Sequence, residues 1–528
     1  MGEMTQPASK KHLLEVWRDQ RVAERKQLNL GGYTGARIDR AALSRWITAA
    51  GSPTADIIRD LPTLRARSRD QMRNAPLALG AVNTTVSHVV GTGLALTPSP
   101  SAALLGMTDD EASAWAENTK LLFDIWAEST DCDLARKLNF YGIQDLGFRS
   151  VLESGDIFVL TPRVARTGAQ EQLVLQLIEA DRACNPNRTA DTPTLVDGIE
   201  FDPDTGETIA VHFARQHPGE TQATPNTWER RLVRGANTGR RNVLHIYKMI
   251  RPGQVRGVPL IAPILEPLKQ LASWTDNELN AAVTSSLFSV FVKMDPEAFD
   301  TLFEEDAQEA IVENAGRWSG KMESGQAINL LPGESIETSS PGRPNPEFDP
   351  FWSAIVRQIG MALDLPFEVL TMHFQSSYSA ARAALLMAWK TFKARRDMLA
   401  TYLCQPTYEL WLADEVAAGR ISAPGFFASP VIRAAWCKAI WTGDGPGSID
   451  PVKEVDAAQK RVDMGISTKD SESILHDGIG WRAKHVQRVK EINAEKRDGI
   501  YLPPMGRAPV AAGSPPPADP APDGQADE

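Results

Sequence analysis

Hydrophobic residues recur at helical spacing in four long segments of the chain. The first, at residues 109–128, places three large aromatic side chains on an amphipathic pattern. The others lie at about 258–290, 347–364 and 379–403. Their apolar stripes are Leu265, Leu268, Ala272, Leu279, Val283 and Val290; Phe348, Phe351, Ile355, Ile359 and Leu363; and Ala381, Leu385, Ala388, Phe392, Leu399 and Tyr402. This spacing predicts helices that pack through one face, the last ending before Pro406.

Strand patterns occupy the stretches between these helices. DIFVLTPRV and QLVLQLIEA alternate apolar and β-branched residues, which predicts strands. Residues 196–219 predict two further strands around a Pro-Asp-Thr-Gly turn. Asp202 and Asp204 resemble part of a calcium loop, but the later bidentate glutamate is missing at its spacing, so we expect a plain hairpin. The mixture of helices and strands predicts an α+β fold.

The stretch FQSSYSAARAALLMAWKTFKARR, residues 374–396, opens the last predicted helix with three serines. A serine nucleophile of the S-x-x-K type needs a lysine one turn on, and Ser379 has Arg382 there, which stays protonated. We therefore expect the serines to cap the helix. Its basic residues are either a solvated face or phosphate contacts; they are Lys390, Lys393, Arg395 and Arg396.

Composition narrows the class of protein. The chain has 528 residues, a formal net charge of −11 and four widely spaced cysteines without a C-x-x-C pair. This predicts a soluble protein without disulfides, zinc site, signal peptide or membrane span. An acidic chain is not expected to grip nucleic acid by counterion release, although nucleic acid could slide past it.

The motifs of common enzymes are missing from the sequence. The nearest phosphate-binding loop, Gly316 to Met322, has three residues between its glycines, and Met322 stands where Ser or Thr would hold magnesium. His212 and His217 are five residues apart, which on a strand places them on opposite faces. We therefore predict no catalytic residues, no metal site and no cofactor.

Six stretches in a fixed order resemble a known family, the lambda-type portal proteins of tailed bacteriophages. They are RARSRDQMRNAPLALGAVNTTVSHVVGTGLAL, IEADRACNPN, VDGIEFDPDTGETIAVHFARQHPG, HIYKMIRPGQVRGVPLIAPILEPLKQL, FWSAIVRQIGMALDLPFEVLTMHFQSSYSAARAALLMAWKTFKARRDML and GSIDPVKEVDAAQKRVDMGIST, together spanning roughly 60–490. None is a strict catalytic motif, and it is their joint order that carries the resemblance.

The resemblance implies a structural protein and no enzyme. It implies a homo-oligomeric ring, usually a dodecamer, at one vertex of the capsid of the virion, assembled in the cytoplasm of the bacterial host. Double-stranded DNA would pass through the ring without sequence specificity. The implied protein partners are the terminase large subunit, then the head–tail connector, with the major capsid and scaffold proteins, and no membrane is involved.

The resemblance also implies a division of the chain into a wing, a helical stem, a small α/β clip and a short helical crown. The implied parts are an N-terminal arm and wing (1–255), a first stem helix (256–290), a clip (291–345), a second stem helix (346–364), a tunnel loop (365–378), a long helix returning to the wing (379–449), a crown (450–502) and a disordered tail (503–528). The residues expected to face the channel are Met372, His373, Phe374, Gln375, Ser376 and Ser377.

Two other classes of protein remain as alternatives. One is a nuclease or hydrolase of the packaging machinery, which would use clustered carboxylates at Asp202 and Asp204 or at 304–309. The other is a soluble helical scaffold or adaptor without a ring. Purified protein that stays monomeric, or that cleaves DNA with divalent metal, would favour one of these.

Overall fold

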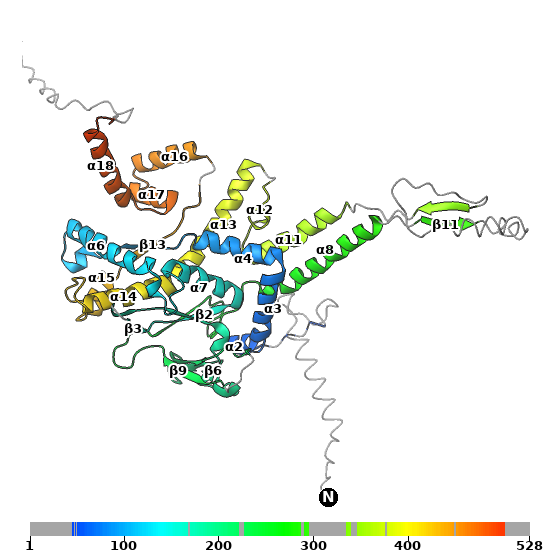
Figure 1. Ribbon diagram of the computed structural model, residues 1–528, viewed down its shortest axis with the longest axis horizontal. Coiled ribbons are helices and arrows are strands. Elements are labelled where there is room, and N and C mark those ends of the chain that lie inside the picture. Colours follow the sequence, from blue (N-terminus) through cyan, green and yellow to red (C-terminus); the bar gives the residue numbers. More distant parts are fainter. Residues whose placement is uncertain are drawn as a thin grey trace, which may run out of the picture.

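The computed structural model describes residues 45, 46, 48, 50–166, 169–220, 226–286, 290–294, 334–338, 346–374, 377–447 and 450–501. Figure 1 shows a body of helices and small sheets, from which α8 and α11 project on one side while α16, α17 and α18 lie above the body. The expected arm and tail and the acids at 304–309 fall outside the described residues, as do Gly316 to Met322. The prediction of mixed helix and sheet is confirmed.

Helices build most of the body. They are α2 (Pro53–Ile58), α3 (Leu61–Asn74), α4 (Pro76–Val89), α5 (Ala102–Leu105), α6 (Asp109–Glu128) and α7 (Phe140–Ser154). The predicted helix at 109–128 is confirmed to the residue. Its start is set by a capping box, because the Thr108 hydroxyl accepts from the Glu111 amide while the Glu111 carboxylate accepts from Thr108.

The strands form several small sheets. They are β1 (Ala95–Pro98), β2 (Asp156–Leu160), β3 (Arg163–Arg166), β4 (Ala169–Leu173), β5 (Gln176–Glu179), β6 (Leu195–Val196), β7 (Ile199–Phe201), β8 (Thr208–Ala214), β9 (Trp228–Leu232), β10 (Val243–Tyr247), β11 (Val290–Met294), β12 (Glu334–Thr338) and β13 (Ala439–Thr442). The sheet orders are β10-β2-β5, β6-β7-β8-β9, β1-β13, β3-β4 and β11-β12. All the paired strands are antiparallel.

The two stretches predicted as single strands, DIFVLTPRV and QLVLQLIEA, each split in two. Their first and last parts pair separately, β2 with β5 and β3 with β4. Pro162 lies between β2 and β3 and has no amide hydrogen for a ladder. The predicted hairpin is confirmed, with β7 and β8 joined by a turn in which the Asp202 carboxylate accepts from the amides of Asp204 and Thr205 at 2.9 Å.

Aromatic side chains from distant segments make the centre of the main core. Phe123 on α6 is fully buried, and its ring lies 5.1–6.0 Å from those of five other aromatic residues, which come from α6, α7, α14 and β13. A second, smaller core lies where Phe158 of β2 packs edge-on against Phe213 of β8. The cores join the sheets to the helices that cover them.

A buried ionic cluster connects the two cores. Asp156 is fully buried, and its carboxylate accepts from Arg65 Nη2 at 2.7 Å and from Arg256 Nε at 2.6 Å. Arg256 is also fully buried and donates to the carbonyls of Ala180, Ala183 and Asp197. Burial alone would raise the pKa of Asp156, but the charges of Arg256 and Arg65 hold it well below its usual range.

Two antiparallel helices project from the body side by side toward β11 (Figure 1). They are α8 (Leu265–Ser286) and α11 (Phe348–Leu363), and Trp274 of α8 stacks on Phe348 of α11 with ring centroids 4.7 Å apart. Leu268, in the first turns of α8, is buried, whereas Leu279 and Val283 near the other end of the helix are exposed. The predicted helical position of Val290 is wrong, because Val290 begins strand β11 and pairs with Thr338.

The last predicted helix is α13 (Tyr378–Leu399), but the chain remains helical beyond it. A π-helical turn, Ala400–Cys404, leads directly into α14 (Gln405–Ala417). The extra residue of a π turn rotates the helix face, so Leu403 is buried and the predicted seam residue Tyr402 is half exposed. The predicted stop before Pro406 is wrong, because proline is tolerated in the first turn of α14.

The C-terminal part consists of α15 (Pro430–Trp436), α16 (Pro451–Asp463), α17 (Lys469–Asp477) and α18 (Trp481–Arg497). Strand β13 pairs with β1 and so joins this part to the N-terminal half of the body. The α16 N-cap is Asp450, whose carboxylate accepts from the Lys453 amide at 3.3 Å, with Pro451 at the first helical position.

Candidate functional site

The segment between α11 and α13 is the candidate site, because it holds all the residues predicted to face a channel. It begins with Asp364 in the left-handed region at φ 58°, which ends α11. A short helix, α12 (Phe367–Thr371), then buries Val369 and Leu370. The first half of the segment is therefore anchored in the core rather than forming a loop.

The second half of the segment is exposed. Met372 ends α12 with φ 54° and has 71% of its side chain exposed, while Phe374 has 51% exposed. His373 and Ser377 are exposed as well. Gln375 and Ser376 lie outside the described residues. An exposed Met–His–Phe sequence without a fixed charge offers surface to a partner but no geometry for catalysis.

The serine before α13 has the backbone of a cap but not its side-chain bond. Ser377 is the N-cap residue, with φ −58° and ψ 152°, and its hydroxyl lies 3.2 Å from the Ser379 hydroxyl. No amide of the first turn donates to the Ser377 side chain. A serine thus stands at the start of the helix as predicted, but the Ser377 side chain does not make the predicted hydrogen bond.

The four basic residues predicted as a cluster on α13 separate into two pairs. Lys390 and Lys393 have exposed side chains. Arg395 is 8% exposed, and its Nη2 donates to the Leu363 carbonyl at 2.8 Å, with the Asp364 carboxylate at 3.6 Å. Because Leu363 is the last residue of α11, the Arg395 guanidinium satisfies a free carbonyl at that helix end.

The Arg396 guanidinium likewise binds free carbonyls at a helix end, that of α4. Its Nε donates to the Val89 carbonyl at 3.0 Å and its Nη2 to the His88 carbonyl at 2.9 Å, both at the end of α4. Nη2 also donates to the carbonyl of Asp444, in the connection after β13, at 3.0 Å. Burial lowers the pKa of Arg395 and of Arg396. Sequence reasoning missed this role, since no local pattern distinguishes an arginine that caps a distant helix.

We expect Arg396→Ala to lower the free energy of unfolding by about 1.5–3 kcal/mol, the value of hydrogen bonds from a charged group. The matched control is Lys393→Ala, one turn away and exposed, which we expect to change it by no more than about 0.5 kcal/mol. Denaturant unfolding followed by tryptophan fluorescence measures both. Equal stability of the two variants would contradict the capping role.

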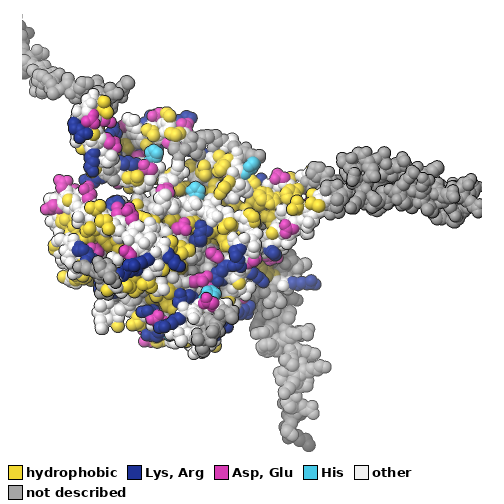
Figure 2. All heavy atoms as spheres, in the orientation of Figure 1, with side chains coloured by type: hydrophobic (Ala, Val, Ile, Leu, Met, Phe, Trp, Pro, Cys, Tyr) yellow, Lys and Arg dark blue, Asp and Glu magenta, His cyan; other side chains and the backbone are white. Residues whose placement is uncertain are grey.

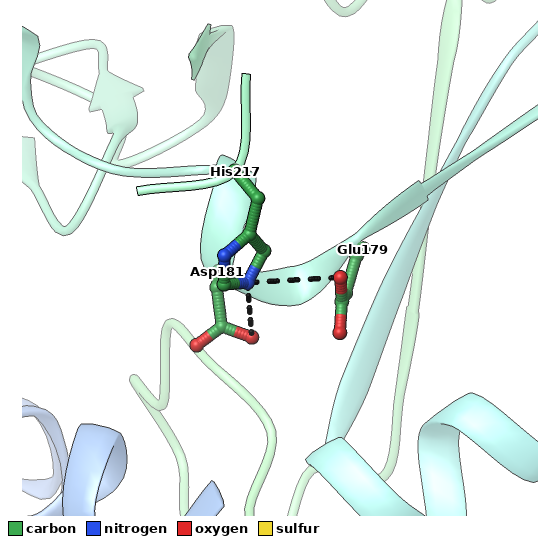
Figure 3. Close-up of side chains that lie close together, drawn as sticks. All are labelled: Glu179, Asp181 and His217. Carbon is green, nitrogen blue, oxygen red and sulfur yellow. Dashed lines mark ion pairs between the residues drawn. The ribbon is translucent and has the colours of Figure 1, made fainter. Parts of the chain in front are cut away.

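A cluster of possible metal ligands lies elsewhere, beside β5 (Figure 3). His217 Nε2 lies 3.7 Å from a Glu179 carboxylate oxygen and 4.0 Å from one of Asp181. Arg69 of α3 pairs with both carboxylates, at 2.9 Å for Glu179. The guanidinium offsets part of the negative charge of the two carboxylates, and the arrangement is an ion-pair network between α3 and the sheet.

His212 and His217, the two histidines considered in the sequence analysis, have different surroundings. His212 lies on β8 with its Nε2 3.0 Å from the Glu200 carboxylate, which also binds Arg230. His217 lies beyond the end of β8, so strand alternation does not apply to it. The side chains of Arg230 and His212 help hold the pKa of Glu200 at about 2, hydrogen bonding by Arg230 being the main cause.

Within the described residues, no helix is sufficiently long and apolar to span a membrane.

The sequence profile of the family described as "Phage portal protein, lambda family" matches residues 39–396. Portal protein B of Escherichia phage lambda is 24% identical over 491 residues, which cover 89% of this chain and 91% of that protein. The portal protein of Escherichia phage N15 is 24% identical over 503 residues, which cover 92% of each. The matched region includes the whole candidate segment and α13 up to Arg396.

Two solved structures of gene transfer agent (GTA) particles each contain a chain that partly resembles this one. A chain in the structure titled "Virion of native gene transfer agent (GTA) particle" has a TM-score of 0.43 and 12% identity, covering 79% of this chain and 93% of that one. A chain in "Neck of native GTA particle computed with C12 symmetry" has a TM-score of 0.41 with the same identity and coverage.

Proposed function

The chain belongs to the lambda family of phage portal proteins, and from this premise we propose that its copies form a ring at one vertex of the capsid. Double-stranded DNA would enter during packaging and leave during ejection through the ring. The observation that carries this proposal is the match to two portal proteins over about nine-tenths of the chain and of each relative. The ring would be part of the virion, assembled in the cytoplasm of the bacterial host.

We propose that two protein partners bind one after the other to the end of the chain that projects from the body. We assign the helices α8 and α11 to the stem and the pair β11 and β12 to the clip, where the terminase large subunit and later the head–tail connector would dock. Contacts with the major capsid and scaffold proteins are proposed for the body. Support comes from the side-by-side course of α8 and α11 away from the core.

The proposed channel loop is residues 372–377. Its exposed part begins directly after the buried residue Leu370, so its base is fixed while Met372 and Phe374 are open to contact. Uncharged side chains suit passage of DNA, because each phosphate held by a fixed cation would have to be released again. Lys390 and Lys393 remain proposed contacts to the DNA backbone, whereas the guanidinium groups of Arg395 and Arg396 bind main-chain carbonyls.

We propose that the protein performs no chemistry of its own. Asp202, the first acid of the suggested nuclease pair, is used in the β7–β8 turn, where it accepts two amide hydrogens. Hydrogen bonding to these amides, first that of Thr205, lowers the pKa of Asp202. The assembly is tested by measuring the mass of the purified protein and imaging it by electron microscopy. Rings are expected, and a stable monomer at micromolar concentration would overturn the proposal.

Deletion of residues 372–377 is expected to leave rings intact and to abolish most DNA packaging. The physical reason is that the exposed loop residues contribute little burial, whereas α12 keeps its anchors Val369 and Leu370. Rings are counted by electron microscopy, and packaged DNA by its protection from nuclease in complemented particles.

The matched control for this deletion is Leu104→Ser, which changes an exposed apolar residue on α5. Normal packaging is expected for this control. Collapse of the rings in the deletion variant would refute the assignment of 372–377 to an exposed channel loop, and normal packaging would refute its role.

A further inference from the structure

Helix α18 lies outside the cores of the chain. No residue of α16 or α17 is buried, and none of the described side chains of α18 is buried either. Its contacts are mainly with α17, through the ion pair of Lys484 with Asp477 and the packing of Lys469 over Trp481. An isolated 17-residue helix is marginally stable in water, so α18 needs a further surface to pack on.

The exposed face of α18 is basic with an apolar centre. The helix has six Lys and Arg residues against two Glu. Val486 and Val489, three residues apart, are each 43% exposed and lie on one face. Lys490 and Lys496 follow on the same side and are exposed. This face is therefore two valines flanked by positive charge.

The exposed face of α6 has the opposite charge. This helix has six Asp and Glu residues against one Lys. Leu121 and Ile125, four residues apart, are 61% and 63% exposed. Glu117 and Glu128 lie before and after them and are exposed on the same face. The face is therefore two aliphatic residues flanked by negative charge, matching α18 in size and opposite to it in sign.

Within one chain the two faces do not cover each other. The two helices meet near their N-termini, where Arg482 of α18 donates to the Ser113 hydroxyl of α6. Figure 2 shows dark-blue side chains over α18 and magenta side chains over the end of α6 below it. The apolar pair of each helix stays exposed beyond that contact.

We propose that α18 of one subunit packs on α6 of the neighbouring subunit, valines against Leu121 and Ile125, with Lys490 and Lys496 facing Glu117 and Glu128. The two faces differ, so the contact is head-to-tail and can repeat around a closed ring. It rests on the proposed function in one respect, the presence of neighbouring copies. Burial of the apolar pairs supplies affinity, and the flanking charges select the register.

Nucleic acid fits the exposed face of α18 less well. A DNA backbone has no apolar surface for Val486 and Val489. An acidic helix with its own exposed aliphatic pair satisfies both the charge and the apolar centre.

Charge reversal tests the proposal. The double variants Glu117→Lys/Glu128→Lys and Lys490→Glu/Lys496→Glu are each expected to raise the protein concentration needed for half-maximal ring assembly about tenfold, because like charges would then face each other. Combining all four changes is expected to restore assembly to within about threefold of the parent chain. The control, Asp204→Lys/Glu207→Lys at the exposed β7–β8 turn, is expected to have no effect.

Cross-linking locates the contact between subunits. A chain with Leu121→Cys and a differently sized, tagged chain with Val489→Cys are mixed during assembly and treated with a short bismaleimide. Three native cysteines are buried and Cys184 is half-buried. Each chain treated alone therefore measures the background linkage through native cysteines. A linked heterodimer is expected only in the mixture.

The outcomes separate this inference from the proposed function. Rings that form normally in every charge-reversed variant, without the linked heterodimer, would overturn the α18–α6 contact and leave the portal assignment standing. Loss of DNA retention by Lys490→Glu/Lys496→Glu with unchanged assembly would overturn it too. A parent chain that forms no rings at all would instead count against the proposed function.

Discussion

Replacement of Arg256 by alanine is expected to destabilise the protein by about 3–5 kcal/mol, the usual cost of removing one partner of a buried ion pair. The side chain is fully buried, and its loss leaves the Asp156 carboxylate with Arg65 and with His245, whose Nε2 lies 3.1 Å away. The carbonyls of Ala180, Ala183 and Asp197 lose their donor as well. A buried carboxylate that has lost one of its two arginine partners has no water to replace that partner.

The matched control for this change is Arg230→Ala. Arg230 makes two hydrogen bonds of 2.7 Å to Glu200, but its side chain is 45% exposed. Water replaces the lost partner there, and the expected cost is about 0–1 kcal/mol. Denaturant unfolding of both variants provides the comparison, with Arg256→Lys added in case the alanine variant does not fold. Equal free energies of unfolding for the two alanine variants would show that the buried cluster contributes little to stability.

The same cluster sets a dependence of stability on pH. Because the pKa of Asp156 is lower in the folded protein than in the unfolded chain, its ion pairs contribute fully above pH about 4. Their contribution is lost as the pH falls below the unfolded value toward the depressed folded one. Acid unfolding should therefore begin at a higher pH in Arg256→Lys than in the parent chain if lysine holds Asp156 less well.

Replacement of Phe123 by alanine is expected to cost about 3–5 kcal/mol, the usual range for Phe→Ala in a core. The Phe123 ring lies edge-on to Trp411 at 5.1 Å and to Tyr408 at 5.8 Å, and tilted against Trp126 at 5.4 Å. Removing it opens a cavity between α6 and α14 that the surrounding rings cannot fill without leaving their packing.

The matched control makes the same substitution at an exposed ring, Phe427→Ala, with Phe427 65% exposed. Its expected effect is within about 0.5 kcal/mol. Thermal unfolding followed by near-UV circular dichroism reports both the stability and the loss of fixed aromatic packing. A Phe123 variant as stable as the Phe427 variant would show that the aromatic cluster is not the centre of the core.

Several features of the fold could be predicted because their causes are local. The helix at 109–128 has its apolar period and capping box within a few residues of each other, and Asp450-Pro451 is a helix start readable from two residues. The β7–β8 turn depends on Asp202 and the amides just after it. In each case the partners of every interaction lie within one turn of chain.

The sequence did not reveal interactions between residues far apart in the chain, nor a local change of helix type. Arg395 and Arg396 lie beside Lys390 and Lys393 in the sequence, yet the two guanidinium groups donate to the carbonyls at the helix ends Leu363 and Val89. Tyr402 fits the helical period of the sequence, but the π turn at 400–404 rotates its side chain outward.

The sequence by itself determined the family, the approximate positions of the four long helices and the exposed residues between α12 and α13. Those properties follow from period, turn chemistry and the order of motifs, which are written along the chain. Only the tertiary structure decided which charges are buried, which arginines cap α4 and α11, and which faces of α6 and α18 stay uncovered. Burial and pairing depend on segments that meet from hundreds of residues apart, as Arg395 and Thr85 do, and a linear pattern does not specify which of them will meet.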